Sequence, residues 1–235
     1  MLNNFQLFGY GHVVSIIIPI AIGFIYILLA KKYPKNIKLI SILFAITIIV
    51  IRSVRYVFDI NLGKFEIFDL LSIHVCNIDL ILLAICLIRP NRKLFTFTFL
   101  VGIPTALSVV LMPGQTHADP GMTRAIFFIM SHMMLVMGSL YLLFAYKFQI
   151  TKKDIKFYYL FSLIGIIIVY IFNLITKANF MYLMKGPENT VLASMYNSLG
   201  PLLYVFSIYI ILITLITLIY YIHKLIYKRI KQSVK

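Results

Sequence analysis

Long apolar runs separated by short polar segments are the feature that most restricts how this chain can fold. Seven runs have close to the ~20 residues that a helix needs to cross a bilayer: 12–30, 38–57, 67–88, 94–112, 123–146, 157–176 and 201–223. Hydrophobic residues fill 62% of the 235 positions and charged residues only 12%, which is too few to cover a soluble domain. The sequence therefore predicts an all-α polytopic membrane protein with about seven transmembrane helices, folded as a single transmembrane domain over residues 1–235.

The basic residues predict how these helices are oriented. Most of the 22 Lys and Arg residues follow the first, third, fifth and seventh runs, in segments 31–38, 89–93, 147–156 and 224–235. Cytoplasmic loops of membrane proteins carry such an excess of basic residues. We therefore expect the N-terminus outside, the C-terminus in the cytoplasm, and a multi-pass protein of the cell membrane. The same residues account for the net charge of +15, so membrane lipid and not nucleic acid is the expected partner, and the sequence leaves protein partners unknown.

Polar and ionisable residues inside the apolar runs gather in the outer half of the predicted bundle. Such side chains are costly in a bilayer, so they face the bundle interior or a water-filled cavity. The third run holds the densest set, which comprises Asp69, Ser72, His74, Cys76, Asn77 and Asp79. Arg52, Arg55, His132 and Asn173 come from three further runs at a similar depth. Four helices thus contribute to one polar layer, and we predict a cavity in the outer half of the protein.

Two turn-rich segments on the outer side add to this layer. The first, 111–122, contains His117 and Asp119, and the second, 178–200, contains Asn179, Tyr182 and Lys185. A loop as long as the second is more often a lid or a binding segment than a plain connector. The histidines of the chain lack diagnostic metal-ligand spacing, so we predict neither a metal nor another cofactor.

Three short motifs carry a resemblance to a known family. They are IHVCN at 73–77, SH at 131–132 and NLITKANFMYLMKGP at 173–187. With these motifs the chain resembles the YwaF-type bacterial integral membrane protein family, although Phe180 stands where that family usually has Tyr and Gly186 replaces a variable residue. That family is similar, at a distance, to an animal membrane acyltransferase group that makes ether phospholipids through a Cys and a His. The resemblance implies that Cys76 is an acyl-accepting thiol and that His74 or His132 is its base.

Helical geometry narrows the choice of base. Cys76 and His74 point about 160° apart on a straight helix, so they are poor hydrogen-bond partners. His132, on another helix, is then the better base, and Asp79 would orient the site or balance its charge. In the alternative without chemistry, Cys76 is a small packing residue and the two histidines form a buried polar pair.

Two classes of function fit this layer. The first is a lipid acyltransferase or lipid hydrolase with catalytic residues Cys76, His132, His74 and Asp79 and with a phospholipid or acyl chain as substrate. The predicted substrate-binding residues are Arg52, Arg55, Asn77, Asn173, Asn179, Tyr182 and Lys185. The two arginines either hold a phosphate or pair with Asp59 or Asp69. The second class is a small-solute transporter or a substrate-binding membrane subunit. A sensor or assembly protein without chemistry is a third hypothesis.

Overall fold

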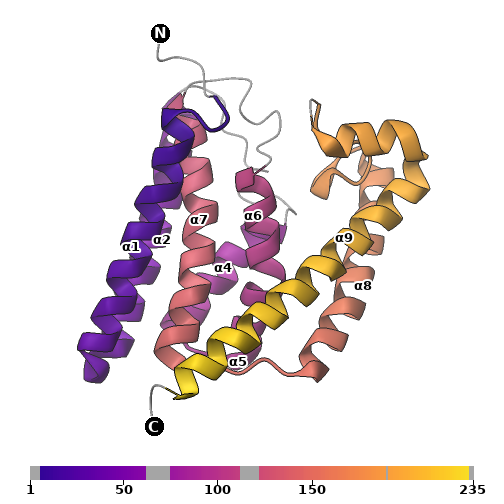
Figure 1. Cartoon of the computed structure of the whole chain (residues 1–235). Coiled ribbons are helices and arrows are strands. Elements are labelled where there is room, and N and C mark those ends of the chain that lie inside the picture. The colour runs from indigo at the N-terminus through magenta and orange to yellow at the C-terminus, as the bar shows by residue number, and fades with distance from the viewer. Residues whose placement is uncertain (1–5, 62–74, 112–121, 189, 233–235) are drawn as a thin grey trace.

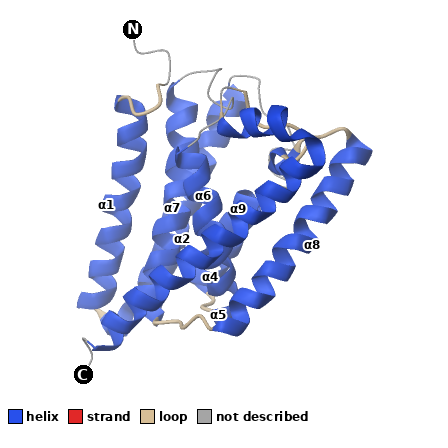
Figure 2. Ribbon diagram, turned by 45° about the vertical axis from the view of Figure 1, so that its right-hand side comes forward, coloured by secondary structure: helices blue, strands red, loops and turns tan. Residues whose placement is uncertain are grey.

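The computed structural model describes residues 6–61, 75–111, 122–188 and 190–232. Within these ranges the chain is helical and contains no β-strand, as Figure 2 shows. Six of the described helices are long and apolar enough to cross a membrane, and a further, shorter apolar helix covers Val75–Ile88. The third predicted run, 67–88, is described only from Val75 onward, because its earlier residues lie outside the described ranges. The all-α polytopic fold predicted from the apolar runs is confirmed.

A central helix, α7, organises the bundle. In chain order the elements are α1 (Tyr10–Lys32), η1 (Pro34–Asn36), α2 (Ile37–Asn61), α4 (Val75–Ile88), α5 (Arg92–Phe97), η2 (Thr98–Gly102), α6 (Ile103–Leu111), α7 (Met122–Tyr146), α8 (Lys152–Thr176), η4 (Phe180–Tyr182) and α9 (Val191–Gln232). The helices α1, α2, α4 and α6 all pack against α7 (Figure 1).

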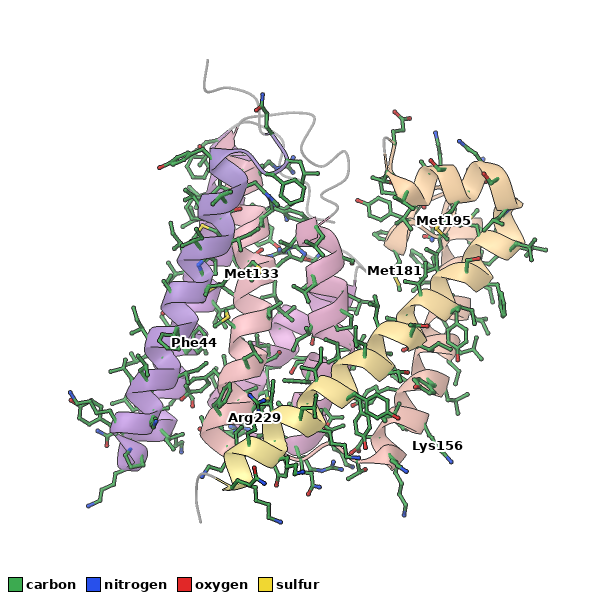
Figure 3. The ribbon with its side chains drawn as sticks, viewed as in Figure 1. Phe44, Met133, Lys156, Met181, Met195 and Arg229 are labelled. Atoms are coloured by element: carbon green, nitrogen blue, oxygen red, sulfur yellow. The ribbon has the colours of Figure 1, made fainter. Side chains whose placement is uncertain are left out.

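In the described part of the chain, α1 begins and α9 ends at opposite ends of the bundle, as an odd number of crossings requires (Figure 1). We call the end at which α1 begins the outer end, following the predicted orientation, and the opposite end the inner end. Figure 3 shows Lys156 and Arg229, two of the basic residues, at the inner end. The arrangement therefore agrees with the separation of charge that the sequence predicts.

The core depends on close helix approach and on buried hydroxyl groups. A Cβ atom at Gly23 of α1 would lie 2.5 Å from the Cβ of Met137, so α1 reaches α7 only because residue 23 has no side chain. Small residues at such crossings are typical of helix packing in lipid, where dispersion contacts take over from the hydrophobic effect. Toward the inner end, the hydroxyl groups of Tyr141 and Tyr146 lie 2.9 and 2.8 Å from Ser41 Oγ of α2. These contacts fix α1 and α2 on α7.

The fourth predicted run crosses the bundle as α5, η2 and α6 in succession, so Gly102 and Pro104 do not break it. A π-helical turn covers Thr98–Gly102, and in it the Ile103 amide donates to the Thr98 carbonyl. Pro104 has no N–H, so a carbonyl one turn earlier loses its usual donor. Wide turns of this kind occur frequently at functional sites.

The last helix corrects the sequence prediction at its outer end. The sequence predicts a loop over 178–200 and a helix over 201–223, but α9 begins at Val191 and ends at Gln232. Gly200 has φ 73° and interrupts α9, so a short arm precedes a long segment that starts at Pro201. Glycine tolerates this left-handed angle, and proline suits the first turn of the segment that follows. Figures 1 and 2 show α9 crossing the bundle diagonally, close to α8 at the outer end and apart from it at the inner end.

Candidate functional site

Two neighbouring helices, α4 and α7, place the predicted nucleophile and the predicted base at the same depth. Both helices run from the outer end toward the inner end and pack side by side. Asp79 of α4 and Leu135 of α7 meet at Gly102 of η2, where a Cβ atom would lie 3.0 Å from Leu135 and would overlap the Asp79 carboxylate. Three residues closer to the outer end on each helix, the same register puts Cys76 level with His132.

Arg52 reaches from α2 to α4 and is held on several sides. Its Nη2 donates to Asn77 Oδ1, and its Nε donates to the Tyr56 hydroxyl at 3.1 Å. The guanidinium carbon also lies 5.1 Å from the centre of the Tyr56 ring. The third nitrogen, Nη1, is buried and has no hydrogen-bond partner among the described residues. The ion pairs of the described ranges do not include Arg52 either. A guanidinium cannot lose its proton, so Nη1 is a fixed donor without an acceptor.

The two cysteines of the chain lie in different environments. The thiol of Cys76 is partly buried, and Arg52, Asp79 and Tyr182 all lie close enough to act on it electrostatically. Cys86, ten residues further along α4 by number, is fully buried in the apolar core, with its thiol 3.4 Å from a backbone carbonyl oxygen. Only Cys76 therefore combines polar neighbours with a position in the outer half, while Cys86 packs as a small apolar residue.

His132 is fully buried, and its ring is held in one tautomer. Nδ1 lies 2.7 Å from the Phe128 carbonyl oxygen, which can only accept, so Nδ1 carries the proton and Nε2 is the basic nitrogen of the neutral ring. The ring also packs on the Phe128 side chain with centroids 4.4 Å apart, and the Arg55 guanidinium lies 4.9 Å from the centre of the Phe128 ring. Arg55 is thus about one turn closer to the outer end than His132. His74, the other predicted base, lies outside the described residues.

Asp79 is fully enclosed beside the π-helical turn. Its side chain has no exposed surface, and neither carboxylate oxygen has a hydrogen-bond partner in the described part of the chain. The carboxylate packs against Gly102, where any side chain would occupy the same space. A carboxyl group in such a place can avoid the cost of a buried charge by taking up a proton. Across the described residues, no group of three or more His, Cys, Asp and Glu side chains is arranged to hold a metal ion.

The segment between α8 and α9 is clamped by side-chain hydrogen bonds. The Asn173 amide both donates to and accepts from the backbone of Phe180, at 2.9 Å each. The Asn179 amide binds backbone groups of Met184 and Lys185 in the same way. The Tyr204 hydroxyl of α9 donates to the carbonyl of Tyr182 at 2.9 Å. Three separate contacts therefore fix the path of η4.

The clamps hold two successive residues of η4 in an unfavourable backbone conformation. Met181 and Tyr182 have φ 57° and 56°, in the left-handed region that residues other than glycine avoid. Such strain costs about 1–3 kcal/mol per residue and is found at functional sites. Here it brings Tyr182 close to Cys76, and Figure 3 shows Met181 on the α6 side of the α8–α9 pair. Burial, and then the neighbouring Cys76, raises the pKa of the Tyr182 hydroxyl, which therefore stays protonated and can donate.

The structure places Arg52, Asn77 and Tyr182 near Cys76, and it places His132 on α7 level with this thiol. We call these residues the outer polar layer, which consists of Arg52, Cys76, Asn77, His132 and Tyr182. Asn173 and Asn179 shape the η4 segment instead of facing outward, and exposed Lys185 pairs with Glu188 at 3.5 Å. A direct role of these three residues in substrate binding stays a prediction.

Sequence reasoning missed two aromatic supports of the layer. Tyr56 and Phe128 each lie four residues from the side chain they hold, Arg52 and His132, and that spacing on one helix face is a readable signal. The approach of Tyr182 to Cys76 has no such signal, because it depends on how η4 folds back toward α4.

The sequence was compared with models of known protein families. The model of the TMEM164 family matches residues 7–223. The chain belongs to the TMEM164 family. Every element that builds the outer polar layer lies inside the region matched by the TMEM164 family, and with the six apolar helices the match identifies a multi-pass integral membrane protein. No curated protein and no solved structure matches the chain. Membership in the TMEM164 family agrees with the expected link to an animal membrane protein family, while the YwaF-type bacterial resemblance stays a prediction.

Proposed function

We propose that the protein is a membrane-embedded lipid acyltransferase or lipid hydrolase whose nucleophile is Cys76. The observation that carries the proposal is the position of this thiol, which shares a depth with the basic nitrogen of a buried histidine and lies beside an arginine with an unused donor. A cysteine becomes a nucleophile as a thiolate, and thiolate formation needs a base or a positive charge nearby. Arg52 supplies the charge, and His132 is the candidate base.

The tautomer of His132 suits the role of a base. Because its Nδ1 proton is committed to the Phe128 carbonyl, Nε2 is the nitrogen that can accept the proton of the thiol. The Phe128 ring, which is tilted against the imidazole with centroids 4.4 Å apart, restricts rotation of the His132 ring and keeps Nε2 in a constant direction. Cys76, His132 and Arg52 come from three helices, α4, α7 and α2, that pack against one another, so the layer is held by the rigid core of the bundle.

The substrate class follows from the surroundings of this layer. We expect an ester substrate to reach the thiol sideways from the lipid, because Cys76 lies on a helix that is apolar on most of its length. Arg52 and Arg55 are placed to meet the anionic and carbonyl oxygens of a phospholipid. Tyr182, whose hydroxyl pKa is raised by burial and then by Cys76, is a further candidate donor near this thiol.

Transport of a small solute is the second candidate function. One observation favours it, namely that Asp79 is enclosed within the bundle and has no hydrogen-bond partner in the described part of the chain. Enclosed carboxyl groups of this kind form ion or proton sites in transporters. Solute uptake by vesicles that contain the protein, absent from empty vesicles, would support this alternative.

Lipid mass spectrometry of cells that produce the protein tests the proposed chemistry. We expect the wild type to change the acyl composition of membrane phospholipids, and Cys76→Ala to abolish the change. Cys86→Ala is the matched control, because it removes the other thiol of the same helix without touching the layer, and it should behave as the wild type. Identical lipid profiles for wild type and Cys76→Ala, with both proteins folded in the membrane, would contradict the assignment of Cys76.

A further inference from the structure

Arg52 differs from an enclosed carboxyl group because its guanidinium cannot become neutral. An enclosed carboxyl group such as Asp79 can take up a proton, but a guanidinium stays charged under all physiological conditions. Leaving a charged donor buried without an acceptor is costly. Tyr56 and Asn77 bind the other two nitrogens of Arg52, so Nη1 is the one nitrogen of this guanidinium that has no hydrogen-bond partner among the described residues.

We propose that Arg52 Nη1 is the donor that binds the ester carbonyl oxygen attacked by Cys76 and then holds the negative charge of the tetrahedral intermediate. This inference rests on the proposed function of Cys76. Donors fixed before the reaction and aimed at a developing oxyanion contribute strongly to catalysis, because no reorganisation is needed when the charge appears. The contacts of Arg52 with Tyr56 and Asn77 provide that fixation.

Depth distinguishes this role from the binding of a phosphate. Arg52 is anchored on Asn77, the residue that follows Cys76, so its guanidinium lies level with the thiol. Arg55 lies over Phe128, about 4.5 Å closer to the outer end along α2. In the outer leaflet, a glycerophospholipid carries its phosphate further out than its ester carbonyls, and the glycerol unit separates them. An ester carbonyl bound at Arg52 would therefore leave the phosphate of the same lipid on the side of Arg55.

In the proposed step, the acyl group of the lipid is transferred to Cys76 with the help of His132 and Arg52. His132 Nε2 takes the proton of the Cys76 thiol, and the sulfur attacks the ester carbonyl carbon to form a C–S bond. The carbonyl electron pair moves onto the oxygen that Arg52 holds. When this pair returns, the C–O ester bond breaks, and the leaving lysophospholipid oxygen takes the proton from His132. The acyl thioester on Cys76 then passes its acyl group to the hydroxyl of an acceptor lipid or to water.

Single-turnover acylation of Cys76 tests the role of Arg52. The purified protein in phospholipid nanodiscs is mixed with increasing amounts of a diacyl phospholipid that carries an alkyne-tagged acyl chain, and the hydroxylamine-sensitive label on Cys76 is followed in time. We expect Arg52→Gln to lower the maximal acylation rate by about 100- to 1000-fold while the donor concentration at half-maximal rate changes less than about threefold. Arg55→Gln should instead raise that donor concentration. Arg92→Gln, an arginine at the inner end, is the control and should leave both quantities unchanged.

The possible results separate the two proposals. If Arg52→Gln changes only the donor concentration at half-maximal rate, or changes neither quantity, the oxyanion role is wrong. If wild-type Cys76 forms no thioester, the proposed function itself fails. Should Arg52→Gln not fold, Tyr56→Phe serves in its place, because it removes only the acceptor for Nε. We expect it to lower the maximal rate by about tenfold, and an unchanged rate in this variant would overturn the role of Arg52 as a fixed donor.

Discussion

The inner end of the bundle and the outer polar layer use charge in opposite ways. At the inner end, Arg92 binds both carboxylate oxygens of Asp154, at 2.8 and 3.2 Å, although its side chain is 45% exposed. In the outer half, Arg52 Nη1 and the Asp79 carboxylate are buried, yet neither has a hydrogen-bond partner among the described residues. Arg92, which water could satisfy, is paired, whereas the buried Arg52 Nη1 and Asp79 carboxylate have no hydrogen-bond partner within the described ranges.

The inner-end contacts hold the helices together, whereas the groups of the outer polar layer are available to a ligand. Asp154 also accepts from the backbone and side chain of Thr151 in a capping box, and Tyr158 donates to the Lys93 carbonyl at 3.2 Å. These contacts fasten α5 to the start of α8. The outer polar layer leaves a donor of fixed direction beside a thiol, which is how a binding or catalytic site differs from a structural network.

The largest effect should come from the histidine of the layer. His132→Asn keeps a donor near the Phe128 carbonyl but removes Nε2, so we expect lipid turnover to fall by about 100- to 10,000-fold without loss of folding. His12→Asn is the comparison, because His12 uses both ring nitrogens, accepting from the Phe8 amide at 3.2 Å and donating to the Val110 carbonyl at 2.9 Å. It should lower the melting temperature and leave the turnover of the folded protein intact. Equal turnover losses in both variants would contradict a specific catalytic role of His132.

The next effect concerns the packing of Asp79 against the π-helical turn. Gly102→Ala places a methyl group where the Asp79 carboxylate lies, so we expect the free energy of unfolding to fall by about 2 kcal/mol in detergent. Gly165→Ala of α8 is the control, since nothing lies within 4 Å of a Cβ atom there. Combining Gly102→Ala with Asp79→Ala should recover part of the loss. Additive losses in the double variant would show that the two residues are not in contact.

A smaller effect should reveal the net charge beside Cys76. In a Cys86→Ala background, an anionic methanethiosulfonate reagent should modify Cys76 about tenfold faster than a cationic one, because Arg52 keeps its charge while Asp79 can take up a proton. Arg52→Gln should remove the preference, and Arg52→Lys should retain most of it. Faster modification by the cationic reagent would mean that an ionised Asp79 dominates the surroundings of the thiol.

The smallest effect belongs to the inner end. Arg92→Ala breaks an ion pair that is partly exposed, so we expect a loss of about 0.5–1 kcal/mol in the free energy of unfolding and no change in lipid products. Thermal unfolding together with lipid analysis checks both parts. A large loss of lipid product in this variant would show that the inner end takes part in function.

The fold could be predicted from the sequence further than the site could. Apolar runs give the helices, and counting residues along them gives depth, which is how Cys76 and His132 come to be assigned to one layer. Rotation of one helix relative to its neighbour is not encoded in such a count, so the contact of Arg52 with Asn77 could not be predicted.

Loops and helix breaks are the other features that could not be predicted from the sequence. The break in α9 at Gly200 and the left-handed backbone at Met181 and Tyr182 depend on tertiary clamps such as the bond from the Tyr204 hydroxyl. Local preferences do not show these clamps, and Asn173 therefore looks like a binding residue in the sequence although its amide holds the backbone of η4.

The most direct test of the central claim is peptide mass spectrometry of the protein after incubation with a phospholipid that carries a tagged acyl chain. We expect one added acyl group on the peptide that contains Cys76, released by neutral hydroxylamine, and none on Cys86. Lipid turnover by a protein whose Cys76 peptide never carries an acyl group, or equal labelling of both cysteines, would contradict the assignment of Cys76 as the nucleophile.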